Sequence, residues 1–296
     1  MAEQFLTGLT AFPLTPADAD GRVRTEELGT LVSRLVDTNV SAIGVLGSTG
    51  IQAYLSRFER QRAVRTAVEA ANGAKPVMVG VGAMRTDEAC ALALDAKQAG
   101  ADWLVLSPIS YTPLAQDEAY QHFVQVASQT DLPLCVYANP STTHFHFSHG
   151  LIMRLAALPT IKAIKLPPLS DSTYAAELAD LRRGCPSDFS LGYSGDWEML
   201  DALAAGADCF HSALAGLLPT PLLALAAQAE HSDHVLADAF APFMELIRVN
   251  GSLRVTYALA NEMGVTTAQP PRPVLPLSAQ LRRQCADAAQ AVLAVI

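Results

Sequence analysis

Lys165 is the residue whose type and position most clearly suggest chemistry. The chain has four lysines, at positions 75, 97, 162 and 165, and the last two lie in the apolar run 161–166. Side chains alternate faces along a strand, so Lys162 and Lys165 should point in opposite directions. An amine facing an apolar interior is costly to keep charged, and a neutral amine attacks carbonyl carbons. We therefore predict a Schiff base at Lys165; the alternative is a surface lysine whose ammonium reaches solvent.

Two further groups of residues could assist that reaction. Tyr137, at the end of the run 134–137, could move the protons that carbinolamine formation and loss of water require, although a strand tyrosine can also be a core residue. The segment Gly47-Ser48-Thr49-Gly50 offers two hydroxyls and consecutive backbone N–H groups, which suit a carboxylate, although it could be an ordinary turn. Together with Lys165, these residues predict chemistry on a small 2-oxo acid.

The elements that must position these residues read as alternating strands and helices. Short runs rich in Val, Ile and Leu recur between amphipathic stretches, which is typical of a parallel sheet. No run is followed by a G-x-G-x-x-G turn, and eight regular units favour closure over an open doubly wound sheet, so we expect a (β/α)₈ TIM barrel. The eight runs are 9–14, 42–46, 77–81, 103–106, 134–137, 161–166, 189–193 and 207–214.

Local signals support this division of the chain. Ser56 followed by Glu59 resembles a capping box that opens a helix to about Ala71. Residues 99–102 and 205–208 are matching Ala-Gly-Ala-Asp turns from a helix into a strand, which suggests that one β/α unit is used twice. We assign residues 1–218 to the barrel and the mainly helical residues 219–296 to a C-terminal helical subdomain.

Polar residues that follow the strands are the remaining candidates, because barrel active sites lie at the carboxyl ends of the strands. His211 could contact the substrate or act as an acid or base, but it could equally be a hydrogen-bonded core histidine. Asp196 could bind substrate or could simply favour the start of a helix through the helix dipole. The substrate-binding candidates are Ser48, Thr49, Gly195, Asp196, His211 and Ser212.

Composition excludes several classes of function. Half of the residues are hydrophobic, and 20 basic against 29 acidic residues give a net charge of −9, which suits neither nucleic-acid binding nor disorder. No basic leader and no long apolar segment is visible, so we expect a cytoplasmic protein without a membrane partner. Five widely spaced cysteines without a C-x-x-C pair, and the isolated histidines 144, 146 and 149, predict neither disulfides nor a metal site.

The motifs also resemble those of a known superfamily. Gly47-Ser48-Thr49-Gly50, Tyr137-x-Asn139-Pro140-Ser141 and Ile164-Lys165, in this order and spacing, are similar to the pyruvate-dependent class I aldolases of the dihydrodipicolinate synthase and N-acetylneuraminate lyase superfamily. The resemblance covers essentially the whole chain. It implies that Lys165 is the Schiff-base lysine, that Tyr137 is the acid/base residue, and that Ser48 and Thr49 bind the carboxylate, one of them also relaying protons.

The same resemblance implies an assembly and a cofactor requirement. Tyr111 matches the tyrosine that a neighbouring subunit inserts into the active site of the synthases, so a homotetramer built from tight dimers, or a homodimer, is expected. No organic cofactor and no metal is implied. The partners would be pyruvate or a related 2-oxo acid, together with an aldehyde or a sugar acid.

Several positions depart from the superfamily pattern. Ile51 stands where a glutamate usually continues the carboxylate loop, and Thr142 stands where the lysine-pathway synthase has an arginine that binds its aldehyde substrate. Leu166-Pro167-Pro168 replaces small polar residues, and residues 195–198 keep only part of the acidic pattern of the sialic acid lyases. We therefore expect neither dihydrodipicolinate synthesis nor sialic acid cleavage.

Three functions agree with this sequence. The first is a Schiff-base lyase of the aldolase type. The second is a 2-keto-3-deoxy sugar acid dehydratase or aldolase, because both outcomes share the enamine intermediate. The third is a non-catalytic barrel that binds a 2-oxo acid, although binding alone needs neither Lys165 nor Tyr137.

Overall fold

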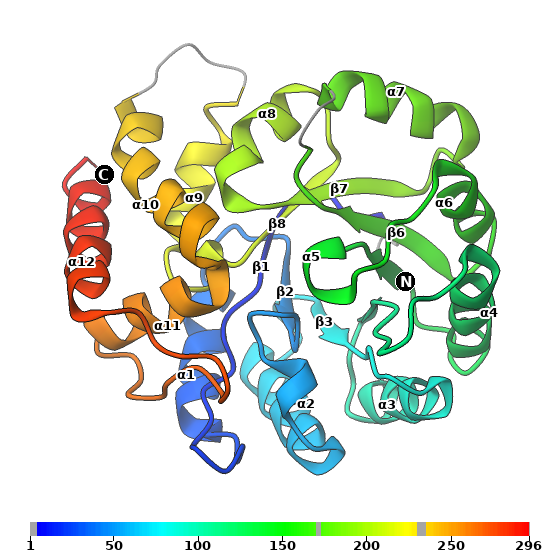
Figure 1. Ribbon diagram of the computed structural model, residues 1–296, viewed down its shortest axis with the longest axis horizontal. Coiled ribbons are helices and arrows are strands. Elements are labelled where there is room, and N and C mark those ends of the chain that lie inside the picture. The colour runs from blue at the N-terminus through cyan, green and yellow to red at the C-terminus, as the bar shows by residue number, and fades with distance from the viewer. Residues whose placement is uncertain (1–4, 170–172, 230–234, 296) are drawn as a thin grey trace.

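The protein is a closed barrel of eight parallel strands, confirming the predicted (β/α)₈ fold (Figure 1). The computed structural model describes residues 5–169, 173–229 and 235–295. Each strand pairs with its neighbours in chain order, and β1 closes the barrel by pairing with β8. The strands are β1 Gly8–Ala11, β2 Ala42–Val45, β3 Val77–Gly80, β4 Trp103–Leu106, β5 Leu134–Tyr137, β6 Ile161–Leu166, β7 Ser190–Ser194 and β8 Cys209–Ser212.

Four of the eight strands, β1, β2, β3 and β8, are shorter than the apolar runs that predicted them. Residues 12–14, for example, are buried but lie beyond the end of β1. A strand ends where its backbone stops pairing, whereas burial continues into the loops that cover the end of the barrel. Hydrophobicity therefore located every strand but overestimated the length of four of them.

Helices cover the outside of the barrel, and those of the C-terminal segment form a further layer at one side of it. Among the described residues they are α1 Thr25–Val36, α2 Arg57–Ala71, α3 Thr86–Gln98, α4 Gln116–Ala127, α5 Pro140–Thr143, α6 His149–Ala156, α7 Tyr174–Gly184, α8 Met199–Ala204, α9 Pro219–Ala226, α10 Val235–Asn250, α11 Ser252–Glu262 and α12 Ala279–Leu293. Short 3₁₀ helices are η1 Gln52–Tyr54, η2 Asp196–Glu198 and η3 Leu214–Gly216. No described helix is long and apolar enough to cross a membrane.

The predicted helix signals are found in place. Ser56 caps α2 by accepting a hydrogen bond from the Glu59 backbone N–H, but the Glu59 carboxylate accepts from the Val23 N–H (2.7 Å) instead of closing the box. In the two matching turns, Asp102 accepts from the Val77 N–H at 2.8 Å and Asp208 from the Leu191 N–H at 2.7 Å. Each aspartate thus ties its strand to the preceding one, and the two units are structurally alike.

The last three helices, α10, α11 and α12, pack against one another at one side of the barrel (Figure 1). Helix α9 packs against α8 and β1, so it lies where the eighth helix of a barrel is expected. The predicted division at residues 218 and 219 falls between β8 and α9. It stays a prediction, because packing alone does not show which part folds independently.

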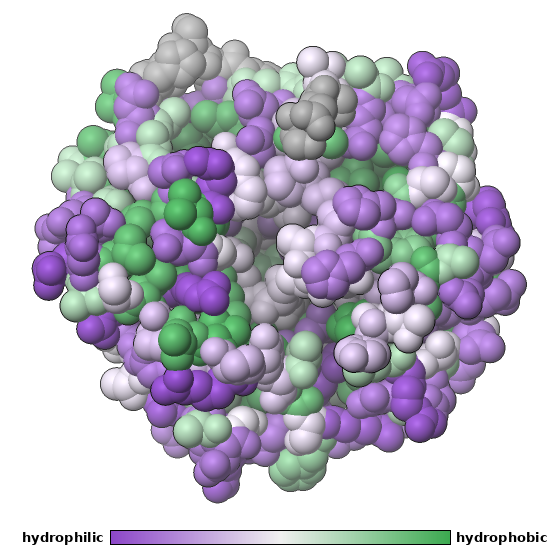
Figure 2. All heavy atoms as spheres, viewed as in Figure 1, coloured by the Kyte–Doolittle hydropathy of each residue, from purple (hydrophilic) through white to green (hydrophobic). Residues whose placement is uncertain are grey.

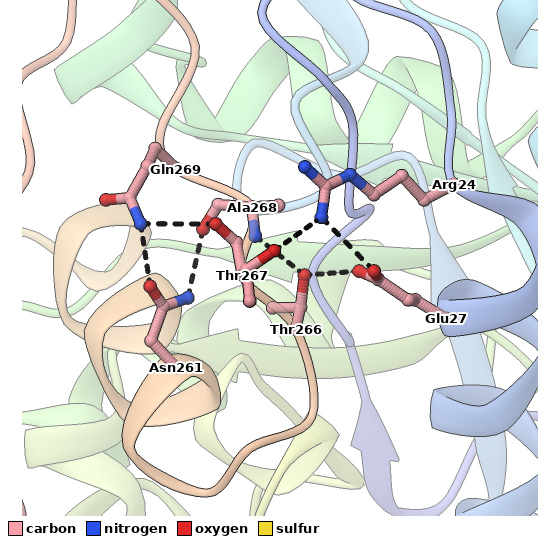
Figure 3. Close-up of polar contacts among 7 residues, drawn as sticks. All are labelled: Arg24, Glu27, Asn261, Thr266, Thr267, Ala268 and Gln269. Carbon is pink, nitrogen blue, oxygen red and sulfur yellow. Dashed lines mark hydrogen bonds and ion pairs between the residues drawn. The ribbon is translucent and has the colours of Figure 1, made fainter.

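Polar contacts join the C-terminal segment to the start of the barrel (Figure 3). Arg24 donates to the Thr267 hydroxyl (2.9 Å) and to Glu27 (3.2 Å), and Thr266 also donates to Glu27. A buried contact reinforces them, because the Tyr257 hydroxyl of α11 donates to the Thr15 carbonyl at 2.8 Å. These contacts hold α11 in a defined position beside the carboxyl end of the strands.

Candidate active site

A cavity of about 750 Å³ opens at the carboxyl ends of the strands. Figure 2 shows the hollow near the centre of this face, surrounded by residues of intermediate hydropathy. Loops after seven of the eight strands contribute to its wall, together with the corner between α10 and α11. The predicted site residues that line it are Ser48, Thr49, Tyr137, Lys165, Gly195, Asp196 and His211. Sites of this size and place are typical of barrel enzymes.

Lys165 lies near the end of β6 and points into the barrel. Its side chain is 6% exposed, and its Nζ lies 4.0 Å from the centre of the Phe12 ring and 4.4 Å from that of Tyr137. Lys162 faces the other side of the strand and pairs with Asp188 at 2.7 Å, as the alternation predicted. The amine is buried between two aromatic rings, and no carboxylate among the described residues pairs with it.

The Tyr137 hydroxyl is the centre of a short hydrogen-bond chain. It accepts from the Asn139 amide nitrogen at 2.9 Å and lies 3.0 Å from the Ser48 hydroxyl. Because the Asn139 amide donates a hydrogen bond to the phenolic oxygen, the O–H of Tyr137 is left free to donate to Ser48 or to a ligand. Tyr137 and Lys165 are paired across β5 and β6, so this hydrogen-bond chain begins beside the Lys165 amine.

The loop that carries Ser48 and Thr49 has a strained backbone. Leu46 and Ile51, on either side of Gly47-Ser48-Thr49-Gly50, have φ values of 57° and 53°, in the left-handed region that such residues rarely adopt. Both are buried, and a Cβ at Gly80 would lie 1.8 Å from the Leu46 carbonyl oxygen, so packing holds the turn in this shape. Packing therefore fixes the loop, and Gly47, Ser48 and Thr49 line the cavity.

His211 is buried beside Lys165 at the end of β8. It is 2% exposed, its ring packs edge-on against Phe12, and burial together with the charge of Lys165 lowers its pKa well below the usual value. Nδ1 has no partner among the described residues, and Nε2 lies 3.5 Å from the Cys209 sulfur. Gly192 makes the room, since a Cβ there would lie 2.9 Å from Nε2. His211 is thus a neutral imidazole in the cavity wall.

Asp196 and Ser212 are more deeply engaged with the protein than the sequence suggested. Asp196 is 4% exposed, its carboxylate accepts from the Leu214 N–H at 3.3 Å, and burial raises its pKa. The Ser212 hydroxyl is fully buried, accepts from the Ala215 N–H at 2.9 Å and does not line the cavity. Gly195, with φ of 95°, turns the chain so that Asp196 faces inward.

Tyr111 does not reach the cavity of its own chain. Its side chain is 94% exposed in the loop between β4 and α4. The predicted insertion into a neighbouring subunit needs such an exposed ring, and it stays a prediction.

The family assignment rests on a match over nearly the whole chain and not on single motifs. The model of the "Dihydrodipicolinate synthetase family" matches residues 5–292. The chain belongs to this family. The match extends from the first strand through α12, and so includes every element that lines the cavity.

Individual proteins that are similar to this chain carry names of the same family. A 4-hydroxy-tetrahydrodipicolinate synthase of Alcanivorax borkumensis is 34% identical over 272 residues, covering 90% of each chain. One of Chlorobium chlorochromatii is 28% identical over 96% of each chain. A crystal structure of a dihydrodipicolinate synthase from Agrobacterium tumefaciens is 49% identical, covers 98% of each chain and superimposes with a TM-score of 0.95. This family member is an enzyme of the lyase class that works through a Schiff base, as the resemblance predicted.

Sequence reasoning missed three contributors to the site. Phe12 was placed in the first strand, and its ring instead packs against Lys165 beyond the end of β1. Asn139 had no predicted role of its own. In the structure its side-chain amide donates to the Tyr137 hydroxyl and orients it. Arg254 comes from α11, and no local pattern signals that it faces a barrel cavity. Among the described residues, no group of three or more His, Cys, Asp or Glu side chains could hold a metal ion.

Proposed function

We propose that Lys165 forms the Schiff base with pyruvate or a related 2-oxo acid, and that the enzyme then acts as a class I aldolase-type lyase. The observation that carries this proposal is the buried Nζ of Lys165, between Phe12 and Tyr137, at the base of the cavity. It is a cavity-lining amine at the carboxyl end of a barrel strand, where catalytic groups of this fold lie.

The reaction begins at the Lys165 nitrogen. Its lone pair forms a bond to C2 of the 2-oxo acid, and one amine proton passes to the former carbonyl oxygen. Tyr137 gives a second proton to that oxygen, which leaves as water, and an iminium ion forms. Tyr137 then recovers a proton from C3, which yields the enamine. The Ser48 hydroxyl, 3.0 Å from Tyr137, relays protons and, with Thr49, binds the carboxylate.

The enamine leads to two outcomes. Attack of its C3 on an aldehyde forms a carbon–carbon bond, and the reverse reaction cleaves one. Loss of a hydroxyl from the carbon next to C3, as water, makes the enzyme a dehydratase of a 2-keto-3-deoxy sugar acid. Ser141, Thr142 and Thr143 line the cavity, and their hydroxyls, which donate to Asn139, can still accept hydrogen bonds from a polyhydroxy chain, so the dehydratase or sugar acid aldolase is the second candidate.

The second substrate differs from that of a lysine-pathway synthase. The relatives carry the name 4-hydroxy-tetrahydrodipicolinate synthase, but Thr142 stands where such synthases have an arginine for the aldehyde. Pro167 and Pro168 also line the cavity and make its wall more apolar after β6. We expect low turnover with aspartate semialdehyde for these reasons. A barrel that merely binds a 2-oxo acid would need neither Lys165 nor Tyr137.

The remaining predicted residues have lesser roles in this proposal. His211 and Gly195 contact the bound substrate from β8 and the loop after β7, whereas Asp196 and Ser212 shape the wall at those two strand ends. Tyr111 of one subunit completes the proton chain of another, in a homotetramer or homodimer. Replacing Tyr111 by Phe should lower turnover and leave the sedimentation coefficient unchanged; full turnover would remove Tyr111 from the site.

Intact-mass spectrometry tests the Schiff base directly. The protein is incubated with pyruvate and cyanoborohydride, which reduces an iminium ion to a stable secondary amine. We expect one covalent adduct, mapping to Lys165, that is absent in Lys165→Ala. Lys162→Ala is the matched control, because Lys162 lies on the same strand and pairs with Asp188 outside the barrel. An adduct that survives in Lys165→Ala, or none in the folded wild type, would contradict the proposal.

A further inference from the structure

The corner between α10 and α11 forms part of the cavity wall. Gly251, with φ of 82°, reverses the chain there, and Ser252 and Arg254 on the first turn of α11 line the cavity. Ser252 lies 3.4 Å from the Thr49 hydroxyl, so this corner touches the carboxylate loop. The buried Tyr257 hydroxyl anchors α11 to the Thr15 carbonyl, which fixes the corner relative to the barrel.

Arg254 is a cation without a counter-ion among the residues that the structure describes. Its side chain is exposed and donates one hydrogen bond, to the Asn250 carbonyl at 3.3 Å. No Asp or Glu of the described chain lies within the 4.0 Å of an ion pair from it. Arg248, in the last turn of α10, pairs with Glu245 at 2.7 Å. The guanidinium of Arg254 is therefore available to a ligand.

Charges are scarce in the cavity. Among the described residues that line it, the charged types are Lys165, Asp196 and Arg254. Lys165 is buried at the base, and the Asp196 carboxylate already binds the Leu214 N–H. Thr142 offers only a hydroxyl, so Arg254 is the exposed cation of the cavity.

We propose that Arg254 binds a second carboxylate of the substrate, at the end remote from Lys165. The inference rests on the proposed function, because the Schiff base defines the near end. The carboxylate of C1 is two covalent bonds from Nζ and must lie in the buried part of the site, beside Ser48 and Thr49. Arg254 is exposed at the rim, so the group that it contacts belongs to the far end of a longer chain.

The planar guanidinium suits this role. It can offer two parallel N–H donors to a carboxylate, which fixes the orientation of the ligand as well as its charge. A cavity of about 750 Å³ exceeds what pyruvate fills and has room for such a chain. The substrate class is accordingly a 2-oxo acid that carries a second carboxylate at its far end.

Trapping with matched pairs of 2-oxo acids tests this inference. Adduct formation is measured against concentration for 2-oxoglutarate with 2-oxopentanoate, and for 2-oxoadipate with 2-oxohexanoate. Within each pair only the terminal carboxylate differs. We expect the wild type to reach half-maximal trapping at about tenfold lower concentration for at least one diacid, as a charge-assisted hydrogen bond at a partly exposed site would give.

The variants decide which residue causes the preference. Arg254→Gln should abolish it, Arg254→Lys should keep part of it, and Arg248→Gln, which removes an exposed cation outside the cavity, should leave it unchanged. Equal weakening of diacids and monoacids in Arg254→Gln would place Arg254 at the C1 carboxylate and overturn the inference. A preference that survives in Arg254→Gln, or no preference in a wild type that traps pyruvate, would also overturn it. Failure to trap pyruvate would instead contradict the proposed function itself.

Discussion

Tyr137 and Lys165 are partners across adjacent strands, and the Lys165 Nζ lies 4.4 Å from the centre of the Tyr137 ring. The pairing sets the amine beside the ring while the phenolic oxygen extends to Ser48 and Asn139. The proposed nucleophile and the proposed proton carrier are thus held by two paired strands of the barrel.

Replacing Tyr137 by Phe should lower turnover by about 10²- to 10⁴-fold, because the proton carrier is lost while the amine remains. Pyruvate should still be trapped at Lys165. Turnover and adduct formation are measured in parallel, with Tyr120→Phe as the control, since Tyr120 packs against Arg154 away from the cavity. Unchanged turnover in Tyr137→Phe would show that another group carries the protons.

Replacing Ser48 by Ala should raise the pyruvate concentration for half-maximal trapping by about tenfold, since one hydrogen bond from a hydroxyl to the carboxylate is lost. Turnover should fall as well, because Tyr137 loses the partner at 3.0 Å. Ser128→Ala, in an exposed cap of α4, is the control. If only turnover changed, Ser48 would serve the proton chain and not the carboxylate.

His211 should make the protein less stable in acid. Its pKa in the folded state lies well below the ordinary 6.5, so below pH 6.5 the unfolded chain binds a proton that the folded protein does not. Stability is therefore full above pH 6.5 and falls as the pH decreases, by up to about 1.4 kcal/mol per pH unit.

Urea unfolding of the wild type and of His211→Asn between pH 7.5 and 5.5, values chosen to bracket the ordinary histidine pKa, measures this effect. The difference between the two slopes isolates His211, because Asp196, whose raised pKa acts in the opposite sense, is present in both proteins. Parallel curves would mean that His211 binds its proton with the same pKa in the folded and unfolded states, and would contradict the prediction.

Gly192 should be indispensable for packing inside the barrel. A Cβ there would lie 2.4 Å from the Cys209 sulfur and 2.9 Å from His211 Nε2. Gly192→Ala should cost about 1 to 3 kcal/mol of unfolding free energy, as overpacking of a dense core does. Gly150→Ala, which meets no atom closer than 3.9 Å, is the control. Combination with Cys209→Ala should recover part of the loss, and no recovery would refute the steric cause.

The sequence by itself determined the barrel and the core of the site. Apolar runs are local signals that recur in every β/α unit, so strand order followed from chain order. Lys165 and Tyr137 could be placed because barrels bring the carboxyl ends of all strands to one face. Hydrophobic runs overestimated the length of β1, β2, β3 and β8, because burial extends beyond the paired backbone.

Only the tertiary structure decided how the site is completed. Phe12 beside Lys165, the space at Gly192 for His211, and Arg254 at the rim bring together residues far apart in the chain. The position of Arg254, for example, depends on how α11 packs against the loop after β1, through the hydrogen bond from Tyr257 to the Thr15 carbonyl. A sequence records the residue types on each element, but side-chain neighbours across elements are set by the balance of packing over the whole molecule.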